Sequence, residues 1–234
     1  MSESFAVRIQ LKTPISLKHL LHFDGLLAAA SVRMHKPWDD IPLDKHEGVW
    51  QGSAAILEVG IHGPIYGEQP RLKKLTVSGD VDDLFTGLPR SQRRITDMSV
   101  WRNRLTYRPL HGSIKSVWFA GRGDAGRAVF LLERLPGIGA MSGTGYGEIE
   151  SVESFTLPDD PMTGLVLNDL PARTFSLNYW DKTLRLPRPE FVSIGLARAE
   201  PPYFEGPRIE CIEPIQISLS GTSREIWEML EVAV

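Results

Sequence analysis

Apolar residues recur at every second position near the start of the chain, at Phe5, Val7, Ile9 and Leu11. This period of two is typical of a strand with one buried face. In the next stretch, HFDGLLAAASVRM, apolar residues lie three or four positions apart, which predicts a helix with Asp24 as its N-cap. The chain is therefore expected to begin with a strand that leads into a helix.

Two further strands are predicted at GVWQGSAAILEVG (48–60) and RLKKLTVSG (71–79), with the turn-rich HGPIYGEQP (62–70) between them. Residues 80–109 have little periodicity, which indicates an arm or hairpin inserted outside the core. A strand is then expected at SIKSVWFAG (113–121).

A second helix is predicted at AGRAVFLLERL, with Asp124 as its cap. Its apolar face is made of Ala128, Leu131, Leu132 and Leu135. The glycine-rich loop 137–147 follows, and then a strand at EIESVESF (148–155). The predicted order of elements here is therefore helix, glycine loop, strand.

The last third of the chain is rich in proline. Two extended pieces, broken at Pro171, are predicted within LVLNDLPARTFSLNYW, and strands are expected near EFVSIGL (190–196) and IQISL (215–219). The other residues between are expected to be irregular, because prolines stand at Pro187, Pro189, Pro201, Pro202, Pro207 and Pro214. A helix over 223–232, capped by Thr222 or Ser223, is predicted near the end.

These elements predict an α+β protein with an antiparallel sheet and helices on one face. Residues 1–157 are expected to form the core, and residues 158–234 to pack on it without being independent. With 234 residues and 42% hydrophobic content, the chain can bury a substantial core without disulfides or metal ions.

The composition argues for a reducing compartment. Cys211 is the one cysteine, which excludes an internal disulfide and a cysteine-clustered zinc site. The start of the chain lacks the features of a signal peptide, and no apolar run reaches the roughly 18 residues needed to span a bilayer. The sequence therefore predicts a cytoplasmic protein with no membrane partner, no metal and no cofactor.

Positive charge is concentrated in one segment. Residues 88–134 carry ten basic and three acidic side chains, a formal charge of +7, and because the whole chain is −3 the remainder carries −10. Such a segment can form a local surface for a polyanion, and arginine offers phosphate a bidentate geometry. The charge distribution alone is equally consistent with arginines that pair with acidic side chains elsewhere in the same chain.

The glycine loop fits neither of the familiar nucleotide motifs. Residues 135–155 contain no lysine, which excludes a Walker loop, and Ser142 stands where a dinucleotide fingerprint counted from Gly137 needs its last glycine. The loop also precedes a strand rather than a helix. Five glycines beside Ser142, Thr144 and Tyr146 instead predict an exposed backbone that can cradle phosphate, the alternative being a plain turn.

A helix that leads into IGAMSGTGYGEIESVE resembles the glycine-rich loop of the RAMP superfamily of CRISPR-associated RNA-binding proteins. The N-terminal TPISLKHLLHFDGLLAAASVR is similar to the small RAMP subunit of type IV CRISPR effector complexes. With FLLERLPGIG, these stretches cover about the first two thirds of the chain. The last third matches only through its proline-punctuated strands.

The resemblance implies a ferredoxin-like, RNA-recognition-like core with an arm inserted at about 80–109. It also implies a subunit that holds the five-prime handle of the guide RNA (crRNA). Its partners would be other subunits of the effector complex, including a backbone RAMP subunit, with target DNA as a further candidate. The residues expected to bind RNA come from the basic segment and the loop: Arg90, Arg93, Arg94, Trp101, Arg102, Arg104, Tyr107, Arg108, Lys115, Gly139, Ser142, Gly143, Thr144, Gly145 and Tyr146.

Two alternatives stay open. Some relatives cleave the guide precursor, and metal-independent RNA cleavage needs a base such as His22 or His111. No complete catalytic constellation accompanies either histidine, so a protein that is not an enzyme is the leading hypothesis. The second alternative is an interaction module whose basic arm binds an acidic protein.

Overall fold

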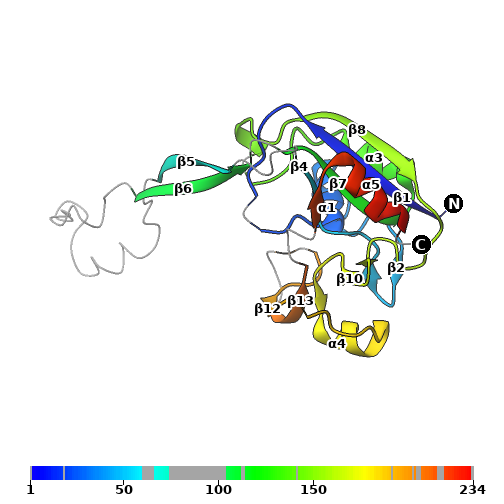
Figure 1. Cartoon of the computed structure of the whole chain (residues 1–234). Helices are drawn as coiled ribbons and strands as arrows, with labels where there is room; N and C mark the ends of the chain where they lie inside the picture. The colour runs from blue at the N-terminus through cyan, green and yellow to red at the C-terminus, as the bar shows by residue number, and fades with distance from the viewer. Residues whose placement is uncertain are drawn as a thin grey trace, which may run out of the picture. The chain divides into compact units, whose positions relative to one another are not determined.

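The structure is a computed structural model that describes residues 2–17, 19–59, 66–73, 104–111, 114–140, 142–190, 192–201, 203, 207–214 and 219–232 (Figure 1). The chain divides into two compact units. One combines Met1–Tyr66 with Leu110–Val234, and the other is Gly67–Pro109. The fold is α+β, as the sequence predicts.

The first unit is organised around a five-stranded sheet with the order β14-β4-β7-β1-β8. β1, β7 and β8 are long and follow the predicted segments closely, whereas β4 and β14 are short. Their bounds are β1 Glu3–Leu11, β4 Ile56–Val59, β7 Ile114–Gly123, β8 Ile149–Thr156 and β14 Ser220–Gly221.

The prediction of a purely antiparallel sheet is wrong at one edge. β4–β7, β7–β1 and β1–β8 pair antiparallel, but β14 pairs with β4 in parallel. Ser220 lies opposite Leu57 and Gly221 opposite Glu58. The reason is that the chain returns from its last third to the free edge of β4 and runs along it in the same direction. The sheet is therefore mixed.

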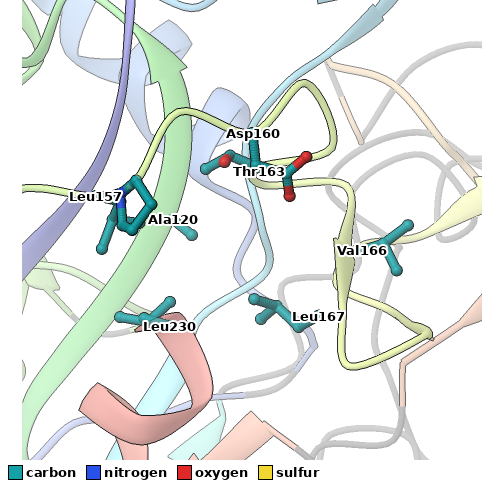
Figure 2. A pocket seen from close by; sticks show the side chains of 8 residues that line it. Ala120, Leu157, Asp160, Thr163, Val166, Leu167 and Leu230 are labelled. Atoms are coloured by element: carbon teal, nitrogen blue, oxygen red, sulfur yellow. The ribbon is translucent and has the colours of Figure 1, made fainter. Parts of the chain in front are cut away.

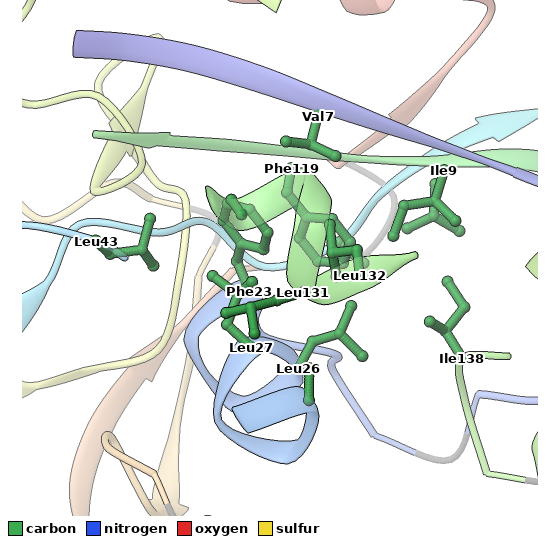
Figure 3. Close-up of a cluster of buried hydrophobic side chains, with 14 of the residues drawn as sticks. Val7, Ile9, Phe23, Leu26, Leu27, Leu43, Phe119, Leu131, Leu132 and Ile138 are labelled. Atoms are coloured by element: carbon green, nitrogen blue, oxygen red, sulfur yellow. The ribbon is translucent and has the colours of Figure 1, made fainter. Parts of the chain in front are cut away.

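Two helices cover one face of this sheet. α1 (Phe23–Arg33) lies between β1 and β4 in sequence, and α3 (Ala125–Leu132) lies between β7 and β8. Figure 3 shows the side chains of both helices and of β1 pointing toward one another. This core contains Val7, Ile9, Phe23, Leu26, Leu27, Phe119, Leu131 and Leu132, all buried.

The prediction that all helices share one face is wrong. α5 (Ser223–Val232) packs Ile226 and Leu230 against Ala6 and Trp118, in a second buried cluster. Because successive residues of a strand point to opposite faces, Ala6 belongs to this cluster while Phe5 and Val7 belong to the other. The sheet therefore has helices on both faces.

Two of the three predicted helix N-caps are present in the structure, and one is not. Asp124 caps α3, because its side chain accepts a hydrogen bond from the backbone N–H of Arg127 at 2.8 Å. Thr222 caps α5 in a reciprocal arrangement with the carboxylate of Glu225. The prediction for Asp24 is wrong: the N-cap of α1 is His22, and the buried Asp24 carboxylate pairs with Arg173.

Beyond β8 the chain forms more regular structure than its prolines suggest. β11 (Phe175–Ser176), β13 (Ile209–Glu213) and β12 (Ser193–Ala197) make an antiparallel sheet in the order β11-β13-β12. β13 was not predicted; Pro207 and Pro214 flank it, where they remove no hydrogen bond within the strand. The strand predicted at 215–219 lies outside the described residues except for its last position.

The extended piece predicted after Pro171 is only partly present. Phe175 and Ser176 are extended, but a helical turn α4 (Leu177–Tyr179) and a π-helical turn η3 (Trp180–Leu184) follow. The Ser176 hydroxyl starts this turn by accepting from the N–H of Tyr179 at 3.2 Å. Two small hairpins complete the unit: β2 (Lys45–His46) with β3 (Val49–Trp50), and β9 (Val166–Leu167) with β10 (Leu170–Pro171).

The second unit contains most of one described pair of strands, β5 (Tyr66–Lys73) and β6 (Arg104–His111), whose outer ends belong to the first unit. β5 includes residues 66–70, where the sequence predicted turns. Of the predicted arm at 80–109, residues 80–103 lie outside the described residues. No helix in the described part of the chain is long and apolar enough to cross a membrane.

Candidate nucleic-acid interface

The glycine loop stands on a fixed base of backbone hydrogen bonds. The N–H of Ile138 donates to Gly147 O at 2.9 Å, and the N–H of Gly147 donates to Pro14 O at 2.9 Å. The N–H of Ala140 donates to Ser16 O at 2.8 Å. The segment after β1 therefore anchors both sides of the loop.

Three of the five glycines are required by this base. A methyl group on Gly137 would lie 2.7 Å from Gly147 O, and one on Gly139 would lie 2.7 Å from Ser16 O. At Gly147 it would collide with Ile138 O. Gly139 and Gly147 also have positive φ angles, 90° and 61°, which favour glycine. These glycines allow two backbone segments to approach closely.

The other two glycines lie at an open tip, which we define as residues 142–146. Ser142–Thr144 form a short 3-10 helix, η2, and Gly145 follows with a φ of 88°. Among the described residues, and apart from the chain neighbours of each glycine, no atom lies within 4 Å of a methyl group built on Gly143 or Gly145. Gly143, Thr144 and Gly145 are exposed, so packing does not account for glycine at positions 143 and 145. The positive φ of Gly145 favours glycine, whereas neither packing nor the backbone requires it at position 143.

The open tip carries no charged residue of its own. At the base, Lys12 pairs with Glu148 at 3.3 Å, and both side chains are about half exposed. This pair is electrically neutral overall. If the tip binds phosphate, its backbone N–H groups supply the hydrogen bonds and the cations come from other parts of the chain.

The structure brings together the predicted loop residues Gly139, Ser142, Gly143, Thr144, Gly145 and Tyr146. Lys115 is exposed on β7, while Arg104, Tyr107, Arg108 and His111 are on β6. Arg90, Arg93, Arg94, Trp101 and Arg102 lie outside the described residues.

His22, one of the two candidate bases, is buried. Its Nε2 lies 3.0 Å from the Thr174 hydroxyl and accepts from the Thr174 N–H at 3.3 Å. Its ring stacks on Tyr203, with centroids 4.6 Å apart. The pKa of His22 is lowered to about 4, chiefly by burial; the nearby Asp24 carboxylate opposes this shift, and Arg173 adds to it. A general base must reach the proton that it removes, whereas the buried His22 ring is in contact with Thr174 and Tyr203.

Next to His22 is a buried ion pair that the sequence did not reveal. Arg173 donates to the Asp24 carboxylate at 2.8 Å, and both side chains are 0% exposed. The Tyr203 hydroxyl donates to Asp24 at 2.8 Å and accepts from Arg173 at 2.9 Å. Arg173 also donates to Ala199 O at 3.0 Å. This network ties α1 to the segments around β11 and β12.

A cavity between the sheet and the loop after β8 is too small for a substrate (Figure 2). Its volume is about 10 Å³, the size that holds one water molecule. It is lined by Ala120, Leu157, Pro158, Asp160, Thr163, Val166, Leu167 and Leu230. Within the described ranges, no three His, Cys, Asp or Glu side chains are grouped to hold a metal ion.

No protein-family model and no curated protein matches the chain.

Proposed function

We propose that this protein is a non-catalytic RNA-binding protein that holds single-stranded RNA at the open tip of its glycine loop. The observation that carries the proposal is that the five glycines of the loop fall into two groups with different surroundings. Gly137, Gly139 and Gly147 are required by packing, whereas Gly143 and Gly145 face open space. A phosphate can approach the backbone there without meeting a side chain at either glycine.

The arrangement of the main sheet supports this proposal. β1, α1, β4, β7, α3 and β8 follow one another in the strand-helix-strand-strand-helix-strand order of a ferredoxin-like unit, if the small β2–β3 hairpin and the second unit are treated as insertions. Both helices lie on one face, and β14 extends the sheet at its edge. RNA-recognition modules use a four-stranded sheet, so a ferredoxin-like, RNA-recognition-like core is part of the proposal.

In the same proposal, the arginine-rich part of the basic segment provides cations for the RNA. Arginines between residues 90 and 108 give phosphate contacts, and Trp101 and Tyr107 give rings for base stacking. Within this RNA-binding class, the resemblance of the loop and the N-terminal stretch supports one particular role. The protein would be the subunit of a type IV CRISPR effector complex that caps the five-prime handle of the guide RNA.

The loop is tested with two matched substitutions. Gly143→Val places a side chain on the open tip, where space and backbone both accept it. Gly195→Val makes the same change at another open glycine, in β12. Hydrogen bonds to charged groups contribute about 1.5–3 kcal/mol, so losing one should weaken RNA binding by about tenfold or more.

The measurement is the dissociation constant for a labelled single-stranded repeat RNA, with thermal unfolding as a check of the fold. Gly143→Val should bind weakly and unfold like the unsubstituted protein, and Gly195→Val should bind normally. Full RNA affinity in Gly143→Val would indicate that the loop is only a turn and does not bind RNA.

The nuclease alternative has its own test. Incubation of the protein with labelled repeat RNA in EDTA should leave the RNA intact. Site-specific cleavage that His111→Ala or His22→Ala abolishes would overturn the non-catalytic proposal.

A further inference from the structure

An aromatic side chain stands on the outer surface of α3. Phe130 is 42% exposed, and the guanidinium carbon of Arg134 lies 3.2 Å from the centre of its ring. Arg134 also donates to the Phe130 carbonyl oxygen at 2.6 Å, which holds the guanidinium over the ring. The two side chains form a preorganised pair, which we call the Phe130–Arg134 stack.

The helix geometry explains why Phe130 is not part of the core. At about 100° per residue, Phe130 points roughly 200° away from Ala128, the centre of the buried face. Arg134 is only about 40° further round, one turn along the same outer face. A large apolar ring at this position makes no contribution to the apolar face of α3.

The stack is close to the open tip along the chain. Arg134 precedes Gly137 by three residues, which span at most roughly 11 Å. Gly137 is fixed in the base of the loop, where it bridges to Glu148. The Phe130–Arg134 stack and the open tip therefore lie on either side of the same loop base along the chain.

We propose, on the basis of the proposed function, that RNA held at the open tip continues onto the Phe130–Arg134 stack. One unpaired base stacks on this pair, and the Arg134 guanidinium contacts a neighbouring phosphate. Phenylalanine rings and guanidinium planes are the surfaces on which proteins stack splayed bases.

The surroundings favour a nucleic acid over a protein partner. The residues three and four positions from Phe130 on the outer face include the charged Arg127, Glu133 and Arg134, whereas protein interfaces have a largely apolar core. Arg127 is already paired with Asp40. Within the described residues, Arg134 forms no ion pair with a carboxylate, and it contacts both the ring and the carbonyl oxygen of Phe130.

Glu133 is exposed beside the stack, so net charge alone does not select RNA at this position. The ring makes the specific contribution, and the experiment therefore changes the ring. Phe130→Ala removes it, Phe130→Leu keeps an apolar side chain without it, and Phe130→Tyr restores it. Val32→Ala is the matched control, because Val32 is an exposed apolar residue of the neighbouring α1 with 54% exposure.

The readout is the affinity for a short labelled oligoadenylate, together with ultraviolet crosslinking located by mass spectrometry. Stacking on one aromatic ring changes affinity by roughly five- to a hundredfold. Phe130→Ala and Phe130→Leu should lose affinity in this range, while Phe130→Tyr and Val32→Ala keep it. A crosslink to Phe130 is expected in the unsubstituted protein.

The outcomes separate this inference from the proposed function. If the unsubstituted protein fails to bind RNA, both are overturned. If it binds, and Gly143→Val impairs binding while Phe130→Ala does not, only the Phe130–Arg134 stack is overturned. Loss of a coexpressed protein partner in Phe130→Ala, at unchanged RNA affinity, would assign the ring to a protein contact and overturn the inference as well.

Discussion

Burial makes His22 a hydrogen-bond acceptor for Thr174 and leaves its imidazole neutral at neutral pH. The folded protein holds the pKa of His22 at about 4, below its ordinary value of 6.5. Between these two values the unfolded chain binds a proton that the folded protein does not. Protonation of His22 therefore favours the unfolded state.

This difference predicts a pH dependence of stability. The contribution of His22 is complete above pH 6.5 and is lost as the pH falls toward 4, at about 1.4 kcal/mol per pH unit. Thermal unfolding across this range should show a declining Tm, and His22→Gln should flatten the decline. His19 is exposed, so His19→Gln should follow the unsubstituted protein. An unchanged pH profile in His22→Gln would contradict the assignment.

Single residues differ in how far the sequence determines them. The cap role of Asp124 follows from its neighbours, and the structure confirms it. The exposure of Phe130 could also be inferred from the sequence, since Phe130 lies opposite the apolar face of its own helix. The pairing of Asp24 with Arg173 could not be inferred from the sequence, because 149 positions separate the two residues and the residues around Asp24 are typical of a helix N-cap.

The Asp24–Arg173 pair fastens the start of α1 to the segment before β11. Burying two charges has a large desolvation cost, which their attraction and additional hydrogen bonds offset. Here Tyr203, Gly25 and Ala199 provide those bonds. Removing one partner leaves the other charge buried without its counterion.

We expect Arg173→Met to lower the free energy of unfolding by about 3–5 kcal/mol. The double variant Asp24→Leu/Arg173→Met should be less destabilised than the sum of the two single variants, because it removes both charges together. Urea unfolding measures all three. Arg224→Met, in the exposed pair with Glu228, is the control and should change stability little. Additive effects of the Asp24 and Arg173 substitutions would show that the two are not coupled.

Elements with strong local patterns were predictable, and elements made by long-range pairing were not. β1, β7, β8 and α3 lie close to where their sequence periods place them. β14 has only two residues and exists because it pairs with β4, about 160 positions earlier. β13 was missed because its flanking prolines suggested irregular structure, although they lie outside the strand.

For the whole chain, the proposed function combines two features that are separate in sequence. The basic segment carries +7 of formal charge in a chain whose remainder carries −10, and the open tip offers backbone without charge. The position of the glycine loop was predictable from its flanking helix and strand. The sequence did not predict which glycines are required by packing and which face solvent. That distinction depends on how closely Pro14–Ser16 approaches the loop.

The most direct test of RNA binding is the salt dependence of the dissociation constant for single-stranded repeat RNA. Each phosphate neutralised on a single strand contributes about 0.7 to the slope of log affinity against log salt. Contacts to about three phosphates from the basic segment therefore predict a slope of about −2 or steeper, with saturable binding at low salt. The absence of saturable binding at about 50 mM salt, or an affinity that salt does not change, would contradict the account.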